Sequence, residues 1–487
     1  MTPVLAIIAP FSAAFAIPLF FVFRKELLGF SVFAFGAVST LTTLAVAAKG
    51  HSGLVSVMGG WSPETGIALV VDNLSAAFLL LATIGFSVSL AASVETFGYG
   101  PWRFYVLFFL SWAATNGILL TGDLFNLFVF FEIFSVAAYL VVAFPPRSWQ
   151  AVEAGFKYLV FGTVGALFLL LGIAYAFMAT GQLNMAILAR VLPTAPPATI
   201  SVVIGCLVVG LFVKSGTVPG HFWLPDAHSS AQTPVSALLS GVFVKASVYV
   251  LLRLSFLLFA VADAKIYSIL LLFGTLSLCL GHLMAFQQED IKRLLAYSTV
   301  AQVGTILIGI GCASPGGAAA AVYHSFNHMA AKMGLFLVAG ALAEDRASRD
   351  IDQMRGLFGH NPAYVLAFCL FAASIAGIPP LSGFMSKWFL LVAAADARAF
   401  VPAVAVAAGT VLSAAYYFRV LRAFFSPSET APPHHRPRPV KNVLVALLVA
   451  LSLFLAALPY IPTFRDGLFA IGSTAFDREG YIERVLP

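Results

Sequence analysis

Long apolar runs separated by short polar segments dominate the sequence. Each run is long enough for a helix of about 20 residues, the length that crosses a bilayer, and none alternates like a barrel strand. We therefore predict an all-α polytopic membrane protein with about 14 transmembrane helices. The predicted spans lie near residues 2–23, 28–48, 73–94, 104–121, 123–143, 157–179, 199–220, 232–257, 265–286, 295–313, 317–342, 362–396, 399–424 and 440–461.

Three segments do not fit a spanning helix. Residues 49–72 are too polar and glycine-rich to span, and they predict a short extramembrane hairpin. Residues 425–439 predict a polar, proline-rich loop, and residues 462–487 predict a modest tail. The first run ends at Arg24 and Lys25 without a basic leader or a small-residue cleavage site, so we interpret it as a span and not a signal peptide.

Spans seven and twelve are interrupted by proline. Span seven continues through VKSGTVPGHFWLPDAH, with Pro219, and span twelve reads AGIPPLSGFMSKW, with Pro379 and Pro380. Each break removes backbone hydrogen bonds that hydrocarbon cannot replace, so protein or water must cover it. Paired broken helices are typical of inverted repeats with a site near the membrane midplane.

Charged residues make up 10% of the chain, against about 25% in a typical soluble domain. Five of them fall inside predicted spans, away from the ends: Glu132, Lys214, Lys245, Lys332 and Lys387. A charge at the bilayer centre costs at least about 2.5–3.5 kcal/mol. One interpretation is that each is a structural ion pair that holds helices together. Four lysines face one obvious acid, however, and burial favours the neutral amine, which can accept a proton. A proton relay is therefore the favoured interpretation.

Histidines extend this polar set. His324 and His328 are four residues apart and share a helix face with Lys332. Because neutral imidazole accepts and releases protons near pH 7, we expect His324 to join the relay. His328 is either a relay member or a hydrogen-bond donor between helices. A metal site is disfavoured because no carboxylate or cysteine accompanies the pair in this segment.

Other polar residues near the span ends favour structural roles. Asp72 and Asp123 stand at helix starts and are predicted to cap them. Lys157 lies four residues after Glu153, which predicts a surface ion pair. The histidines that flank the break in span seven are predicted to cap helix ends; they are His221 and His228.

No motif for a bound cofactor stands out. The chain has no Walker motif, no GxGxxG after a strand, no CxxC, no HExxH and no GxSxG, so we expect no nucleotide, flavin, haem or iron–sulfur group. The cysteines lie in apolar segments and predict packing, not disulfides or metal ligation. They are Cys206, Cys279, Cys312 and Cys369.

Basic residues predict the orientation. Loops after odd-numbered spans hold Arg24, Arg103 and Lys292, among others, whereas loops after even-numbered spans hold few, such as Lys49 and Arg190. Since cytoplasmic loops carry the excess of arginine and lysine, the odd loops are expected in the cytoplasm and both termini outside.

Five segments together resemble one family. They are TGDLFNLFVFFEIFSVAAYLV, VKSGTVPGHFWLPDAH, QQEDIKRLLAYSTVAQVG, FNHMAAKMGLFLVAG and AGIPPLSGFMSKW. They are similar to the antiporter-like subunits of respiratory complex I, membrane-bound hydrogenases and multisubunit Mrp cation/proton antiporters, over nearly the whole chain. TGQLNMAIL and the tail YIERVLP are most similar to the D subunits of Mrp antiporters, whereas DAHSSAQTPVSALLSG is also similar to hydrogenase versions.

The resemblance implies two inverted five-helix repeats, spans four to eight and nine to thirteen, with helices seven and twelve broken. The implied division is 1–103 for helices one to three, 104–258 and 259–425 for the repeats, and 426–487 for the polar loop, last helix and tail. It also implies a set of relay residues by motif: Glu132, Lys214, Lys245, His324, His328, Lys332 and Lys387.

The implied function is a proton-translocating subunit of an Mrp-type Na⁺/H⁺ antiporter. The alternatives are a proton-pumping subunit of a hydrogenase or complex I-like redox complex, with no redox centre of its own, and a membrane scaffold that transports nothing. The expected partners are other subunits of a membrane complex, the lipid bilayer and protons, with Na⁺ as a candidate second ion and no nucleic acid. The expected location is the bacterial inner membrane.

Overall fold

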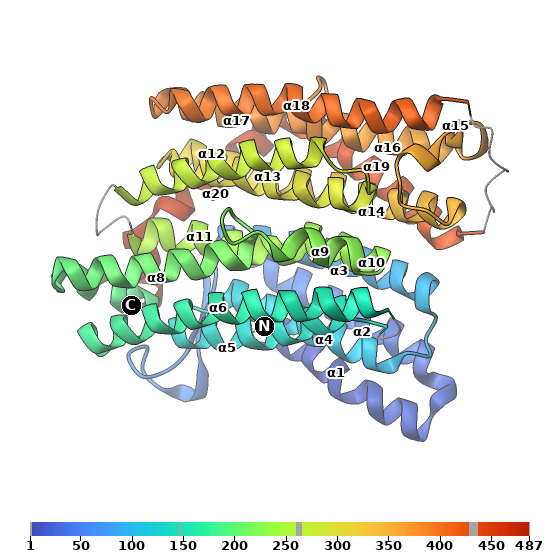
Figure 1. Ribbon diagram of the computed structural model, residues 1–487. Coiled ribbons are helices and arrows are strands. Elements are labelled where there is room, and N and C mark those ends of the chain that lie inside the picture. Colours follow the sequence, from blue (N-terminus) through green and yellow to red (C-terminus); the bar gives the residue numbers. More distant parts are fainter. Residues whose placement is uncertain (1, 146–147, 260–264, 428–436, 487) are drawn as a thin grey trace.

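The computed structural model describes residues 2–145, 148–259, 265–427 and 437–486, and they are mostly helical. In Figure 1 the long helices run side by side, from α1 and α5 in the lower part through α8 and α13 to α18 at the top. The bounds of the long helices in the first half are α1 (Leu5–Phe23), α2 (Leu28–Ala47), α3 (Asn73–Phe97), α4 (Trp102–Leu120), α5 (Leu124–Val142), α6 (Trp149–Thr180), α8 (Pro197–Ser215) and α11 (Val244–Leu257).

The second half repeats this pattern of long helices. Their bounds are α12 (Lys265–Phe286), α13 (Ile291–Gly311), α14 (Pro315–Arg346), α16 (Pro362–Ala376), α17 (Ser382–Asp396), α18 (Phe400–Phe425), α19 (Pro439–Ala457) and α20 (Pro462–Phe476). Four shorter helices connect them, and a fifth, α21, follows the last: α7 (Met185–Val191), α9 (Trp223–Ser230), α10 (Thr233–Leu238), α15 (Leu357–His360) and α21 (Arg478–Val485).

The predicted spans are confirmed. Among the described residues, 13 helices are long and apolar enough to cross a membrane, and each overlaps one predicted span. The remaining predicted span, span twelve at 362–396, is the pair α16 and α17, whose separate halves are too short. The chain is therefore a multi-pass membrane protein of the predicted all-α class. The loop predicted over 425–439 lies mostly in 428–436, outside the described residues.

The two broken spans have the same local construction. Helix α8 ends at Ser215 and is followed by Gly216 with φ of 69°, while α16 ends at Ala376 and is followed by Gly377 with φ of 84°. Glycine is required there because a Cβ disfavours the left-handed region. Three residues further on, each break contains a proline after a cis peptide bond, Pro219 in the first and Pro380 in the second. This likeness supports the two repeats, whose boundaries stay a prediction.

The segment 49–72 forms the predicted hairpin. Strands β1 (Leu54–Val57) and β2 (Ala68–Val71) pair antiparallel, with Leu54 opposite Val71. Asp72 then caps α3 by accepting the backbone N–H of Ser75. Two contacts of 2.7 Å join its carboxylate to Arg253 of α11. Burial alone would raise the pKa of Asp72, but Arg253 and the Ser75 hydrogen bonds outweigh it and lower the pKa.

The tail is more ordered than the sequence predicts. Residues 462–487 hold α20, which packs on α14, and α21, which packs on α7. Asp477 starts α21 by accepting the backbone N–H of Gly480 at 2.9 Å. Tyr481 and Val485 then fall on one buried face, and the Tyr481 ring lies 5.1 Å from the Arg253 guanidinium. The tail therefore packs over the buried ion pair between Arg253 and Asp72.

Candidate functional site

Glu132 and Lys214 meet at the first break. Glu132 lies in the middle of α5 and Lys214 in the last turn of α8, where the helix end carries partial negative charge. Lys214 Nζ is 3.6 Å from Glu132 Oε1 and donates a 2.6 Å hydrogen bond to Ser135 Oγ, one turn further along α5. The lysine side chain is 3% exposed and the glutamate 41%, so the pair extends from the interior to an open face.

Lys245 is buried beside an irregular turn. The π-helical turn Leu239–Phe243 joins α10 to α11, and such turns are common at functional sites. Lys245 Nζ donates to the Ser240 carbonyl of that turn at 2.6 Å and contacts His328 Nδ1 of α14. The sequence did not predict the π turn, because the single glycine inside it, Gly241, does not distinguish a π turn from an ordinary helix.

The two histidines of α14 face different neighbours. His328 faces Lys245, whereas His324 Nδ1 lies 2.9 Å from Ser386 Oγ of α17. His324 Nε2 lies 3.0 Å from Gln302 Oε1 of α13. Both histidines are fully buried, and their ring centroids are 6.4 Å apart. Helix α14 therefore contacts Lys245 through His328, and through His324 it contacts Ser386, the residue before Lys387.

Lys332 and Lys387 end in similar surroundings. Lys332 Nζ donates to the Leu295 carbonyl at 2.9 Å and to the Tyr417 hydroxyl at 3.3 Å. Lys387 Nζ donates at 2.9 Å to the carbonyl of Ala376, the last residue of α16, and at 3.2 Å to Thr410 Oγ1. Each amine is thus held by one carbonyl and one hydroxyl.

These contacts separate the two interpretations of the buried lysines. In the described part of the chain, Lys245, Lys332 and Lys387 form no ion pair with a carboxylate, and only Lys214 has one, with Glu132. A carbonyl or hydroxyl oxygen, which carries no full charge, can accept a hydrogen bond from either a neutral amine or an ammonium. The interpretation that each buried lysine belongs to a structural ion pair therefore does not hold for three of the four. No metal-binding group of three or more His, Cys, Asp or Glu occurs among the described residues.

Lys292 is a further buried lysine, and its predicted place in a loop is wrong. Asp290 accepts the backbone N–H groups of Lys292 and Arg293, so α13 starts at Ile291 and not near 295. Lys292 is 6% exposed and donates to the Ala231 carbonyl at the end of α9 at 2.8 Å. The aspartate before IKRLL was the available signal for this earlier helix start.

Predicted caps have mixed outcomes. Asp72 and Asp123 do cap α3 and α5. Neither His221 nor His228 caps α9, whose first residue lacks a side-chain cap. His228 instead stacks on Phe336 of α14, with ring centroids 4.7 Å apart. Its two ring nitrogens have no hydrogen-bond partner among the described residues.

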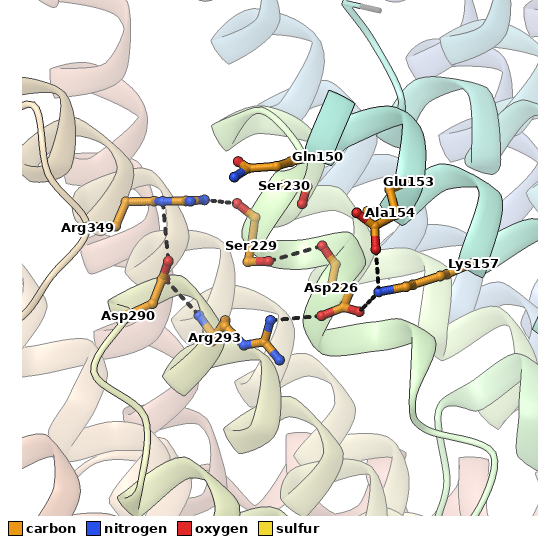
Figure 2. Close-up of a pocket in the computed structure, with 10 residues that line it drawn as sticks. All are labelled: Gln150, Glu153, Ala154, Lys157, Asp226, Ser229, Ser230, Asp290, Arg293 and Arg349. Carbon is orange, nitrogen blue, oxygen red and sulfur yellow. Dashed lines mark hydrogen bonds and ion pairs between the residues drawn. The ribbon is translucent and has the colours of Figure 1, made fainter. Parts of the chain in front are cut away.

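A polar cavity of about 250 Å³ opens at the end of α6, α9 and α13 (Figure 2). Asp226 of α9 is its central group, with Lys157 at 3.0 Å and Arg293 at 2.8 Å. Lys157 also binds Glu153 at 2.9 Å, as predicted from their spacing. On the other wall, Arg349 lies 3.2 Å from Asp290. The cluster anchors the second half of the broken span to its neighbours.

The site helices succeed one another across the molecule. Helix α5 packs on α6 and α6 on α8, then α8 on α11, and α14 on α17. Figure 1 shows the same order, from α5 in the lower part through α8 and α14 toward α17 near the top. The polar groups therefore form a row across the helices, with Lys214 and Lys387 near its two breaks.

Comparisons with known proteins agree on one family. The family described as NADH:quinone oxidoreductase/Mrp antiporter, TM matches residues 121–413. The N subunit of NADH-quinone oxidoreductase from Desulforudis audaxviator is 36% identical over 84% of this chain and 82% of its own length. The D subunit of the Na⁺/H⁺ antiporter from Alkalihalophilus pseudofirmus is 32% identical over 95% of this chain and 94% of its own.

Two solved structures share the fold over nearly all of both chains. A chain of the membrane-bound sulfane sulfur reductase, an archaeal respiratory membrane complex, has a TM-score of 0.93, 28% identity and 99% coverage of each chain. A chain of the Mrp complex from a Dietzia species has a TM-score of 0.89 and 25% identity, covering 100% of this chain and 99% of that one. Both neighbours are subunits of multisubunit membrane complexes.

Proposed function

The chain belongs to the NADH:quinone oxidoreductase/Mrp antiporter transmembrane family, and we propose that it carries protons in an Mrp-type Na⁺/H⁺ antiporter. It is an antiporter-like membrane subunit, as its relatives are. The Mrp assignment is supported by the antiporter relative from Alkalihalophilus pseudofirmus, which aligns with 95% of this chain. We place the protein in the bacterial inner membrane, with both termini on the outer side.

One observation carries the proposed mechanism: buried lysines succeed one another across the helices, and three of the four (Lys245, Lys332 and Lys387) have no carboxylate partner among the described residues. In the proposed path a proton is held on Lys214 while Glu132 is close, because the carboxylate stabilises the ammonium. Withdrawal of Glu132 then favours release. Lys214 Nζ lies 3.6 Å from Glu132 Oε1, which corresponds to the state in which the lysine keeps its proton.

The later steps use the contacts around α14. Lys245 exchanges a proton with His328, with which it is in direct contact. His324 and Ser386 lead to Lys387, which exchanges with the opposite side of the membrane. Three steps lack a direct side-chain contact among the described residues: Lys214 to Lys245, His328 to His324, and Ser386 to Lys387. Intervening water or side-chain rotation completes the path there.

Protons suit this row better than Na⁺. Sodium prefers sets of oxygen ligands, whereas the groups that line the row are mainly amines and imidazoles. We therefore assign proton movement to this chain and cation movement to a sibling subunit.

The open side of Glu132 supports a partner subunit at α5. Exposed apolar residues recur along the same face of α5 at helical spacing: Phe125, Val129, Val136 and Leu140. Glu132 lies within this stripe, and a carboxylate that faces lipid is costly. We propose that a neighbouring subunit covers this face and sets the distance between Glu132 and Lys214.

Replacement of Lys214 by alanine tests the function. Everted vesicles that contain the complete complex are given an acid interior, and Na⁺-dependent proton release is followed with a pH-sensitive dye. Lys214→Ala should abolish the signal at unchanged subunit content, because it removes the proton carrier beside Glu132. Lys49→Ala, at an exposed lysine outside the row, is the matched control and should transport normally. Normal transport by Lys214→Ala would refute the proposal, and loss of assembly would favour the scaffold.

A redox-driven complex is the second candidate. It is favoured by the sulfane sulfur reductase chain with its TM-score of 0.93 and by the 36% identity to an N subunit of NADH-quinone oxidoreductase. Purification of the native complex separates the two. Small membrane subunits and a Na⁺-dependent proton signal support the Mrp assignment. Iron–sulfur subunits and a proton signal that requires an electron donor support the redox complex.

A further inference from the structure

A second line of polar groups leaves the row at Lys332. Two neighbouring tyrosines of α18, Tyr416 and Tyr417, point their hydroxyls at Ser298 of α13, at 2.9 and 3.1 Å. The Tyr417 hydroxyl also lies 3.3 Å from Lys332 Nζ. At the other end, the Tyr416 hydroxyl lies 3.3 Å from His282 Nδ1 of α12. All five side chains are buried, and each link is a side-chain contact within hydrogen-bonding distance.

The donors and acceptors of this line have a consistent direction. Tyr416 donates to Ser298, so its lone pair can accept the N–H of His282 Nδ1. Ser298 then donates to Tyr417, and Tyr417 donates to Lys332 when that amine is neutral. Each hydroxyl accepts one hydrogen bond and donates one, which is the arrangement that passes protons along a chain.

The line ends close to a surface. His282 is four residues before Phe286, the last residue of α12, which corresponds to about 6 Å along the axis. The exposed Gln287 and Glu289 follow immediately. The ring of His282 packs on Gly409 of α18, where a Cβ would lie 3.0 Å from Nε2. A glycine at that position leaves room for the imidazole between the two helices.

We propose that His282, Tyr416, Ser298 and Tyr417 form a proton-access branch between Lys332 and the surface at the end of α12. The branch rests on the proposed proton relay and adds a route to it. A proton binds His282 Nε2, and the proton on Nδ1 moves to Tyr416. Tyr416 passes its own proton to Ser298, Ser298 passes one to Tyr417, and Tyr417 passes one to Lys332. The amine becomes an ammonium, one proton has crossed, and no oxidant or reductant takes part.

Other buried tyrosines show that this arrangement is not simply how the fold satisfies a hydroxyl. Tyr323 donates to the Leu455 carbonyl at 2.6 Å, and Tyr249 donates to the Leu119 carbonyl at 2.8 Å. A backbone carbonyl accepts a hydrogen bond but has no proton to pass on. Tyr416 and Tyr417 instead bond to side chains that both accept and donate, so their hydroxyls suit transfer.

The test uses the complete complex in everted vesicles, with Tyr416→Phe as the main variant. This change removes one oxygen and keeps the ring, so transport should fall at least tenfold while subunit content stays unchanged. Tyr323→Phe removes a buried hydroxyl outside the branch and should transport as the unmodified complex does. If Tyr416→Phe lowers assembly, Ser298→Ala interrupts the same line with a smaller change.

His282→Ala supplies a readout that a structural role would not give. Added imidazole should restore part of its transport, because free imidazole replaces the lost proton acceptor. Wild-type rates in Tyr416→Phe and His282→Ala, while Lys214→Ala remains inactive, would overturn the branch and leave the relay standing. Loss in His282→Ala that imidazole does not restore would make the residue structural and also overturn the branch. Normal transport by Lys214→Ala would instead remove the relay on which the branch rests.

Discussion

At the residue scale, three lysines of the proposed row place their amines against main-chain carbonyl oxygens. The acceptors are Ser240 in a π-helical turn, Leu295 inside α13 and Ala376 at the end of α16. A carbonyl carries only partial negative charge, so it stabilises an ammonium less than a carboxylate would. Such amines can change protonation state without leaving an opposite charge buried and unpaired. The sequence predicted that most buried lysines lack a carboxylate partner, because the predicted spans contain few acidic residues.

Gln302 is the residue-scale partner that the sequence did not single out. Its Oε1 lies 3.0 Å from His324 Nε2, and it comes from α13, 22 residues before the histidine. Gln302→Leu keeps a similar volume and removes the hydrogen bond. Because one buried hydrogen bond is worth about 1.4 kcal/mol, transport should fall roughly tenfold at unchanged assembly. Dye-monitored vesicles measure the rate, and an unchanged rate would show that Gln302 does not orient His324.

At the element scale, the apolar runs predicted the spans because each must cover the hydrocarbon. Proline and glycine predicted both breaks. Helices α6 and α14 begin earlier than their apolar runs because Ser148 and Ser314 cap polar first turns. In the tail, Asp477 caps α21, whereas α20 has no side-chain cap and buries Leu468 and Ala475 on the face that packs on the rest of the chain. The π turn before Lys245 escaped prediction because tertiary packing, and not a local residue pattern, selects it.

Gly377 gives an element-scale test of the second break. With φ of 84°, it occupies a region that costs other residues about 1–2 kcal/mol, and a Cβ would lie 2.9 Å from Lys387 Cδ. Gly377→Ala should therefore lower the melting temperature of the purified complex and slow transport by displacing Lys387. Gly205→Ala, on an exposed face of α8 with nothing near its Cβ, is the control and should change neither. Full activity and stability of Gly377→Ala would show that the break does not position Lys387.

At the scale of the whole molecule, the row depends on contacts between distant segments. Lys245 and His328 are 83 residues apart, and His324 and Ser386 are 62 apart. The residues themselves were predictable, because charges in apolar runs and the family motifs mark them. Their neighbours were not, because the partners Ser135, Gln302 and Tyr417 are ordinary polar residues whose positions follow from helix packing. Only the folded chain shows that His328 contacts Lys245 whereas His324 contacts Ser386 and Gln302.

Lys245 joins the two halves of this row, so its replacement is the decisive test of the relay. The complete complex is reconstituted in liposomes, and proton flux driven by a Na⁺ gradient is measured with Lys245→Met, which keeps the length of the side chain and removes the amine. We predict flux equal to that of protein-free liposomes, with all subunits retained. Flux equal to that of the unmodified complex would contradict the relay.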